Sequence, residues 1–277
     1  MKKNISNKNI YFLRPLLLFI IVIIVLSSCN PTKYVPTDET LLDAIHVTVN
    51  KEGIKKSDLL PYIKQKPNKK IFGTKFHLGL YNLSNINKSK WPHSWLRDIG
   101  EEPVIYDPYA TAKSRDQIQS YIASKGYFDS NVTETIETAN RKSKVYYNVD
   151  LKTPYTIRNL YFEIPDTNIR KIFNLDSFNC MIERGSPYDV DILQAERTRF
   201  ERLVKDRGFY SFSSADHIFF NVDSTIGDRQ VNIYYGVKKF LKLDQYNQAV
   251  LGPHSIYRVR NIYIYPDFVP RDALEGG

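Results

Sequence analysis

The sequence has few cysteines and lacks the residue clusters that mark metal or catalytic sites. Cys29 and Cys180 are the only two cysteines among 277 residues, which excludes a framework of several disulfides. Cys180 has no basic neighbour, so we expect a small buried thiol there. The histidines show no pair four residues apart and no nearby cysteine; they lie at positions 46, 77, 93, 217 and 254. We therefore predict no catalytic residue, no metal and no cofactor, and no enzyme.

The sequence also lacks the signals of a nucleic-acid-binding protein. Four of its 39 Lys and Arg residues lie before residue 15, which leaves 35 to balance 30 Asp and Glu. The remaining bases are scattered along the chain rather than gathered into one run. There is no zinc-finger spacing, no Gly-rich phosphate loop and no arginine tract. Nucleic acid is therefore not an expected partner.

The apolar run near the N-terminus is too short to cross a bilayer. Leu16–Leu26 has eleven apolar residues, whereas a membrane-spanning helix needs about 20. A signal-peptide core has roughly 7 to 15, and it follows basic residues such as Lys2, Lys3 and Lys8. We therefore predict that residues 1–28 are a secretory signal peptide. The alternative is an uncleaved helical anchor that ends in a chance cysteine.

The end of this run carries a lipidation signal. Leu26-Ser27-Ser28-Cys29 resembles the bacterial lipobox, which implies a lipoprotein that carries diacylglycerol and palmitate on Cys29. Asn30 resembles an outer-membrane sorting residue, and no acidic cluster resembling a surface-export signal follows it. We therefore expect an outer-membrane lipid anchor with the body in the periplasm. Residues 29–40 are polar and interrupted by proline, which predicts an extended tether.

Residues 114–151 carry the signals of a helix followed by two strands. Ser114 has Gln117 three residues later, the spacing of a capping box, and Gly126 ends the predicted helix. The alternation in residues 132–136 and 145–151 then predicts two strands, with a turn at residues 140–143.

The same order recurs about 80 residues later. Asp191 is a predicted N-cap, Gly208 ends the helix, and residues 218–222 and 231–237 alternate as strands. The opening strand repeats as well, because residues 155–161 match residues 257–263. Such internal similarity predicts tandem small domains of strand, helix, helix and hairpin, which is an α+β fold.

Residues 69–108 give no clear prediction of a helix or strand. Glycines and prolines break any regular period in this stretch, and it contains both tryptophans, Trp91 and Trp95. The favoured interpretation is that the tryptophans hold a long loop onto its own domain. The alternative is that they enter a membrane interface, where aromatic rings with a polar group are favoured.

Several short motifs occur in an order that resembles a known family. They are Gln65-Lys66-Pro67-Asn68, Leu80-Tyr81-Asn82, Gly100-Glu101-Glu102-Pro103, Gly126-Tyr127-Phe128 and Arg184-Gly185-Ser186-Pro187-Tyr188-Asp189. The repeated unit resembles the POTRA domain of outer-membrane assembly proteins. With the lipobox, the chain resembles the N-terminal region of TamL, the lipidated Bacteroidetes member of the BamA and TamA superfamily.

That resemblance implies tandem POTRA-like β-α-α-β-β units, each a three-stranded sheet packed by two helices. The first would span residues 41–152 with an insertion at about 66–110, and the second 153–240. Residues 241–277 would form a linker and the start of a third unit. Members of this family continue into a membrane β-barrel, and the resemblance leaves open whether the natural product does so beyond Gly277.

The resemblance also implies a binding scaffold. POTRA domains resemble peptide-docking modules in which an extended segment pairs with a sheet edge, so the implied partners are unfolded outer-membrane proteins. Whether a TamB-like partner exists stays open. The alternative function is a lipid-anchored structural adaptor of the cell envelope that binds no such clients.

The first hairpin strand of each unit would be a free edge. In the first unit Glu134 stands between apolar positions, and an inward-pointing charge protects against unwanted pairing. The second unit has no such charge, so we predict partner binding at Ile218, Phe219, Phe220, Asn221 and Val222. The alternative is that Phe219 packs under a neighbouring domain. Asn221→Pro is expected to obstruct pairing by removing a backbone donor.

Lipidation gives the first testable prediction. Labelled palmitate should enter the wild-type chain but not the Cys29→Ala variant, because the acyl group needs the thiol. The measurement is incorporation of label into protein recovered from the membrane fraction. Equal labelling of both chains would show that Cys29 is not the attachment site.

Overall fold

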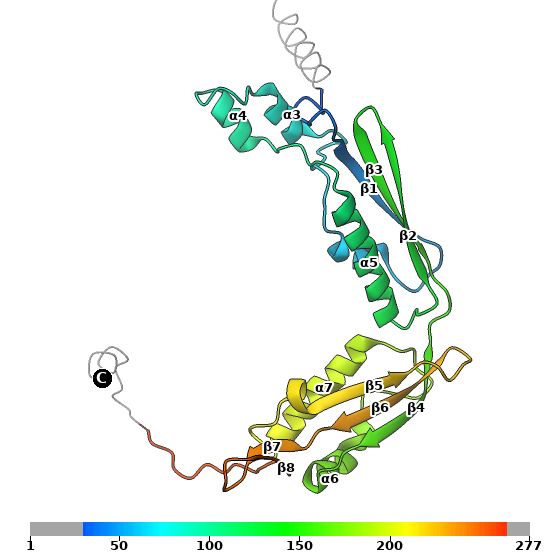
Figure 1. The fold of residues 1–277 in the computed structure, drawn as a ribbon, viewed down its shortest axis with the longest axis vertical. Helices are drawn as coiled ribbons and strands as arrows, with labels where there is room; N and C mark the ends of the chain where they lie inside the picture. The colour runs from blue at the N-terminus through cyan, green and yellow to red at the C-terminus, as the bar shows by residue number, and fades with distance from the viewer. Residues whose placement is uncertain (1–29, 265–277) are drawn as a thin grey trace, which may run out of the picture. The chain divides into compact units, whose positions relative to one another are not determined.

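The computed structural model describes residues 30–264, which form two compact units (Figure 1). Unit 1 comprises residues 30–123 and 127–152, and unit 2 comprises residues 124–126 and 153–264. The predicted signal peptide and Cys29 lie outside the described residues. Within residues 30–264 no helix has the length and apolar character needed to span a membrane.

Unit 1 is a three-stranded sheet with helices. Its elements are β1 (Leu41–Val49), α2 (Lys56–Leu59), the 3-10 helix η1 (Leu60–Tyr62), α3 (Phe76–Leu83), α4 (His93–Ile99), α5 (Pro108–Ser124), β2 (Asn131–Ala139) and β3 (Lys142–Asp150). The strand order is β1-β3-β2, with β3 parallel to β1 and antiparallel to β2. The hairpin turns at Asn140 and Arg141, which both have positive φ, as a two-residue turn requires.

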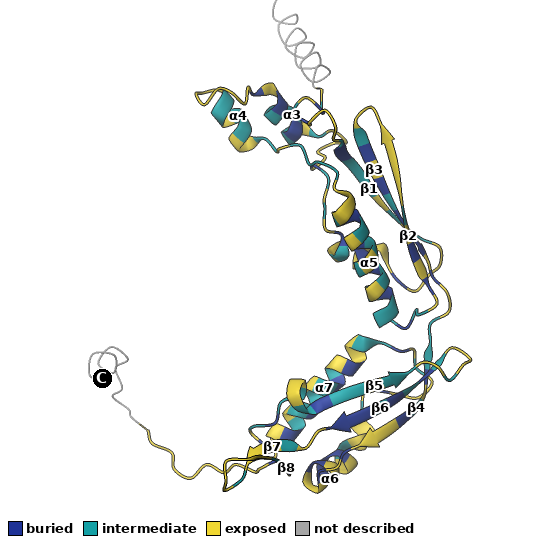
Figure 2. Ribbon diagram, in the orientation of Figure 1, coloured by how far each residue is buried: buried dark blue, intermediate teal, exposed yellow. Residues whose placement is uncertain are grey.

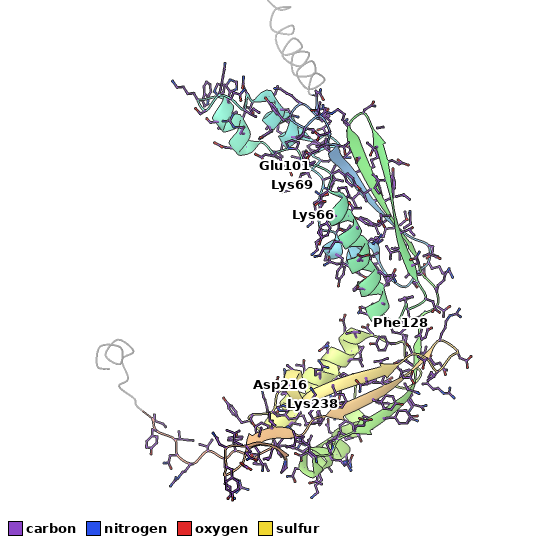
Figure 3. All side chains as sticks on the ribbon, in the orientation of Figure 1. Lys66, Lys69, Glu101, Phe128, Asp216 and Lys238 are labelled. Carbon is purple, nitrogen blue, oxygen red and sulfur yellow. The ribbon has the colours of Figure 1, made fainter. Side chains whose placement is uncertain are left out.

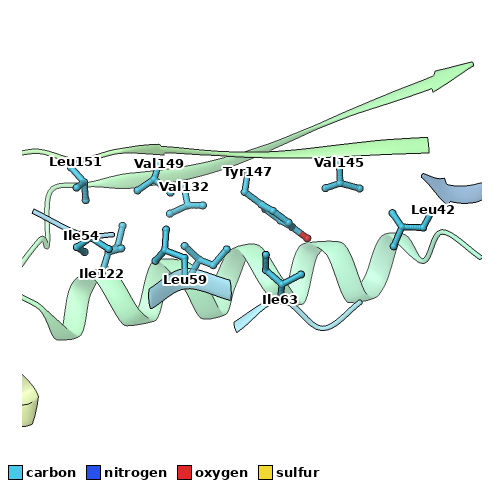
Figure 4. Packing of buried hydrophobic residues seen from close by; sticks show 11 residues of the cluster. Leu42, Ile54, Leu59, Ile63, Ile122, Val132, Val145, Tyr147, Val149 and Leu151 are labelled. Carbon is cyan, nitrogen blue, oxygen red and sulfur yellow. The ribbon is translucent and has the colours of Figure 1, made fainter. Parts of the chain in front are cut away.

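One apolar cluster joins the sheet of unit 1 to its helices (Figure 4). Val145, Tyr147 and Val149 alternate along β3 and point at α5, which presents Ile118 and Ile122. Burial of an aliphatic side chain of this size stabilises the fold by roughly 1.5–3 kcal/mol. The Tyr147 hydroxyl donates to the Thr111 carbonyl at 3.3 Å, so its polar atom is satisfied inside the cluster.

Unit 2 repeats this architecture. Its elements are β4 (Thr156–Glu163), α6 (Thr167–Asp176), η2 (Ser177–Asn179), α7 (Val190–Lys205), α8 (Ser214–His217), β5 (Ile218–Asp223), β6 (Gln230–Val237), β7 (Phe240–Leu243) and β8 (Ala249–Gly252). The strand order β4-β6-β5 is the counterpart of β1-β3-β2, and β7 pairs with β8 in a separate hairpin. Central strand β6 is mostly buried, whereas β5 is largely half-buried (Figure 2). The predicted α+β class with three-stranded sheets is confirmed.

Both long helices begin earlier than predicted. α5 starts at Pro108, so Ser114 lies in mid-helix rather than at a cap. There its buried hydroxyl donates to the Ala110 carbonyl at 2.6 Å and accepts from the Lys64 amide at 2.9 Å. The N-cap of α7 is Asp189, not Asp191, because the Asp189 carboxylate accepts from the Asp191 amide.

The predicted tether is not an extended spacer in its described part. Residues 30–40 form turns, and Val35 is buried with Leu41 and Leu78 in a small second core. The Asn82 side chain donates to the Asn30 carbonyl at 3.1 Å, and Lys33 Nζ donates to the Asn82 carbonyl at 2.6 Å. Proline keeps this segment out of regular structure but does not prevent it from packing.

The strand predicted at residues 257–263 is also absent. The structure assigns no regular element to residues 253–264. A strand needs a ladder partner, and no strand within residues 30–264 pairs with this segment. Its Tyr257 amide instead donates to the Gly208 carbonyl at 2.7 Å.

Asp166 gives a test of how unit 2 is held together. Its buried carboxylate caps α6 through the Asn168 and Ile169 amides and accepts from the His254 amide at 2.7 Å. Burial alone would raise the Asp166 pKa, but these hydrogen bonds outweigh it and hold the pKa below its usual value.

We predict that Asp166→Ala lowers the free energy of unfolding by about 1–3 kcal/mol, since a cap and a buried acceptor are lost. The lowered pKa means that this contribution is present above about pH 4 and is lost as pH falls through the folded-state value. Urea unfolding at neutral pH measures it. Asp206→Ala, at the C-terminal end of α7, is the control and should change little.

Candidate docking edge

The two outer strands of unit 2 differ in how their open sides are covered. The start of β4 is paired on its outer side with residues 185–188: the Gly185 amide donates to the Ile157 carbonyl at 2.7 Å, and the Tyr188 amide to the Tyr155 carbonyl at 2.9 Å. This is part of the Arg184–Asp189 motif of the sequence. Among residues 30–264 no strand pairs with the outer side of β5. Within the described residues β5 therefore has no covering segment, whereas β4 is covered at its start.

The covered edge is built in the same way in unit 1. There the Leu42 amide donates to the Val104 carbonyl and the Tyr106 amide to the Thr40 carbonyl, both at 2.8 Å. The segment that makes these contacts follows the Gly100–Pro103 motif. The Gly100–Pro103 motif thus precedes a segment that covers the start of β1, and the Arg184–Asp189 motif contains one that covers the start of β4. In the part of the chain that the structure describes, the first strand of each hairpin, β2 or β5, has no such cover.

Hydrogen bonding at the end of β5 shows which main-chain groups face outward. The Lys238 amide donates to the His217 carbonyl at 2.8 Å, so this opposed pair is hydrogen-bonded. The ladder runs without a bulge, and bonded pairs alternate in antiparallel sheets. Residues 219, 221 and 223 therefore bond to β6, while Phe220 and Val222 direct their amides and carbonyls to the open edge. The Ile218 carbonyl also points there, but the Ile218 amide donates to the Ser214 carbonyl at the end of α8. Asn221→Pro would thus remove a hydrogen bond to β6 rather than a donor at the open edge. The prediction that it removes an edge donor is therefore wrong.

The Phe219 side chain packs against its own sheet. It lies opposite Gly236 on β6, and its ring fills the space that a Cβ at Gly236 would need. An aromatic ring over a cross-strand glycine restores packing that the missing side chain would have supplied. Packing onto Gly236 accounts for Phe219 without a neighbouring domain.

The inward side of the edge strands differs between the units. In unit 1 Glu134 on β2 accepts from Arg115 on α5 at 2.9 Å. In unit 2 Arg197 lies 82 residues after Arg115, the same spacing as Gly208 after Gly126. The Arg197 guanidinium lies 5.4 Å from the ring centre of Phe220, which also packs 4.7 Å from Tyr235. An ion pair in unit 1 is therefore replaced by a cation–π contact at the matching place in unit 2.

Sequence reasoning placed Glu134 on the inner face but missed its partner. The sequence could have indicated an arginine at this place. Arg115 and Arg197 each stand three and seven residues before the apolar residues of their predicted helices. Glu134 faces opposite Tyr147, and Phe220 faces opposite Tyr235, the fully buried tyrosine of each central strand.

A shallow pocket of about 360 Å³ adjoins the start of β5. Phe219 and Val237 form its apolar floor, and Arg170, Lys238 and Glu163 surround it. His217, which leads into β5, has its pKa lowered by burial and by nearby His254, whose ring centre is 4.7 Å away. His217 is therefore neutral at neutral pH, and the charged groups near this end of the edge are Arg170 and Lys238 together with Glu163 and Asp216.

The second cysteine is not a reactive site. Cys180 is partly buried, and burial raises the pKa of its thiol to about 11. A thiol with that pKa is protonated at neutral pH and is a poor nucleophile. Across residues 30–264 there is also no group of three His, Cys, Asp or Glu side chains that could hold a metal ion.

Comparison with known families identifies the fold of unit 1. Residues 43–152 match the POTRA family, described as "Surface antigen variable number repeat". Unit 1 therefore contains a POTRA domain, as the motifs implied. No curated protein matches the chain.

Several solved structures are similar to the chain at low identity. POTRA domains 3–5 of BamA from Haemophilus influenzae share 14% identity at a TM-score of 0.30, covering 74% of this chain and 100% of that one. POTRA domains 1–2 of the periplasmic domain of Omp85 from Anabaena share 11% at 0.30, covering 71% and 94%. CdiB from Escherichia coli shares 8% at 0.27, covering 86% of this chain and 36% of that one. The fold assignment rests on the family match and the strand order.

The directions of the main-chain groups in β5 predict different effects for proline substitutions at two neighbouring residues. Val222→Pro removes an amide that points to the open edge, so the β5–β6 ladder should persist. Asn221→Pro removes a ladder bond to β6 and should cost about 1–3 kcal/mol more in the free energy of unfolding. Urea unfolding of both variants measures the difference. A greater loss for Val222→Pro would reverse the deduced hydrogen-bonding pattern.

Proposed function

We propose that this chain is a lipid-anchored periplasmic scaffold of outer-membrane protein assembly, of the TamL type. The POTRA domain of unit 1 and the open edge of unit 2 support a binding role. The lipobox before Cys29 and the following Asn30 support attachment to the outer membrane with the body in the periplasm. The observation that carries the proposal is the uncovered strand β5.

In this proposal an extended client segment adds a fourth strand beside β5. The outward amides and carbonyls of Phe220 and Val222, with the Ile218 carbonyl, would supply the main-chain hydrogen bonds. A typical net contribution is about 1 kcal/mol for each bond, so three residues give weak and reversible binding. Pairing through the main chain does not require a particular client sequence, which suits unfolded outer-membrane proteins of many sequences.

The matching strand of unit 1 is less suited to this role. Glu134 holds a negative charge on the inner face of β2, and the strand carries Glu137 and three threonines as well. Charge on an edge strand disfavours addition of another strand. The aromatic and aliphatic residues of β5 impose no such cost, so the second unit is the proposed docking site.

The test moves the charged residue of unit 1 into unit 2. Phe220→Glu would place a carboxylate beside Arg197, as Glu134 stands beside Arg115. With a photocrosslinking residue at exposed Asn221, the parent protein should crosslink to unfolded outer-membrane proteins in cells, and the Phe220→Glu variant should lose most of this product. Circular dichroism checks that the variant is folded.

Thr133→Glu on β2 is the matched control, since it adds the same charge to an exposed position of the other edge. It should leave crosslinking unchanged. Crosslinks that persist in folded Phe220→Glu would place the docking site elsewhere. Products containing only a folded envelope protein would support the structural adaptor instead. Recovery of a TamB-like protein would identify a partner in addition to clients.

A further inference from the structure

Residues 64–97, which include most of the insertion of unit 1, are strongly basic. Residues 64–97 contain no Asp or Glu and eight bases: Lys64, Lys66, Lys69, Lys70, Lys75, Lys88, Lys90 and Arg97. Among the described ion pairs only Lys75 takes part, with Asp43 at 2.9 Å. Lys66 and Lys69 lie with Glu101 near the base of the insertion (Figure 3), where Glu101 accepts from the Lys69 amide. A count of charges over the whole chain therefore hides a concentration of basic residues in residues 64–97.

The same segment exposes aromatic side chains. Trp91 is 78% exposed and Trp95 is 50% exposed, so the prediction that they pack onto their own domain was wrong. Phe72 is fully exposed at the tip of a tight turn closed by mutual hydrogen bonds between Ile71 and Thr74. Its φ of 46° is a left-handed conformation, which is uncommon for a bulky residue. Exposed aromatic residues of this kind indicate a binding surface.

The insertion also lies beside the residue that follows Cys29. Asn30 is held by the Asn82 side chain at the end of α3, and the Ser84 carbonyl accepts from the Tyr34 hydroxyl. Pro31 shares a pocket of about 350 Å³ with Phe76 and Leu83 of α3. Lys70, Lys75 and Lys142 contribute to the same pocket. A lipid on Cys29 would therefore begin one residue from this folded surface.

We propose that the insertion, residues 66–110, docks on an anionic phospholipid bilayer surface, with Trp91 and Trp95 in the interface and the lysines toward lipid phosphates. The orientation rests on the proposed acylation of Cys29. Tryptophan is enriched at the membrane interface because its ring is apolar and its N–H is polar. Lysines near an anionic surface add to binding, and the four acidic residues of the insertion all follow Arg97, outside the lysine-rich part.

A bilayer fits these observations better than a protein partner. The connection between Ser84 and Trp91 carries Lys88 and Lys90, both exposed, next to the exposed side chains of Ile86 and Trp91. Lysine is depleted from protein interfaces, whereas lysine combined with tryptophan is typical of surfaces that lie in the headgroup region.

The chain carries its own probe, since Trp91 and Trp95 are its only tryptophans. The full lipidated protein is reconstituted into vesicles of phosphatidylethanolamine and phosphatidylglycerol. Bromine atoms placed near the headgroup end of the acyl chains should quench its tryptophan emission, the emission should shift to the blue, and aqueous iodide should lose access. Trp91→Phe and Trp95→Phe assign the signal to each ring.

Charge is tested with a Cys29→Ala chain that begins at residue 29, which carries neither acyl groups nor the predicted signal peptide. Its partitioning to vesicles should weaken about fivefold for each lysine in Lys88→Gln and Lys90→Gln. Lys238→Gln, in unit 2, is the matched control and should leave partitioning unchanged.

Palmitate labelling of the same preparation separates the two proposals. A labelled protein whose tryptophans stay open to iodide and are not quenched by bromolipid would overturn membrane docking while leaving the lipid anchor intact. An unlabelled protein that still shows bromolipid quenching would support docking and refute acylation of Cys29. Tryptophans shielded from iodide but not quenched by bromolipid would indicate a protein partner and would also overturn the inference.

Discussion

A three-stranded sheet has one face that must be removed from water, and in both units a single long helix does most of this work. The contact is centred on a fully buried tyrosine of the middle strand, Tyr147 or Tyr235. Because the helix must cross that tyrosine, the helix residues that meet it recur at the same spacing: Ile118 and Ile122 in α5 match Phe200 and Val204 in α7. The strand order, the hairpin and the cover over the opening strand recur in both units together with this packing.

The same constraint explains why the edges can differ while the cores do not. A position on the inner side of an edge strand lies at the margin of the helix, where it meets the long side chain of an arginine. Either a carboxylate or an aromatic ring can lie against that arginine, as Glu134 and Phe220 do. The choice changes the edge without disturbing the core, so repeated units with a common architecture can offer different surfaces for pairing.

Local patterns predicted what depends on local physics. Alternation along β3 and β6 indicated the strands, and Gly126 and Gly208 indicated where the helices end, because both signals are set within a few residues. The start of α5 was missed because Ser114 has the composition of a cap, while its actual role depends on Lys64, which is distant in sequence. The direction of the Asn221 amide depends on the register of the hairpin, which the pattern of side chains does not specify.

The tryptophans were misread for a related reason. Aromatic residues in a long loop usually pack inward, and only the positions of α3 and α4 show that Trp91 and Trp95 do not. The concentration of bases in residues 64–97 was visible in the sequence, but counting charge over the whole chain concealed it. A count over shorter windows would have located them, because all four acidic residues of the insertion follow Arg97.

The contacts between residues 30–35 and α3 have a further consequence for any group attached at position 29. A folded domain on a flexible linker explores a volume that grows with the length of the linker. The effective concentration of its surfaces near the anchor falls accordingly. Here the chain is fixed to the fold from Asn30 onward, so the linker has almost no free length. Surfaces near α3 would face the anchoring medium at a high and constant effective concentration, and even weak contacts there would be occupied most of the time.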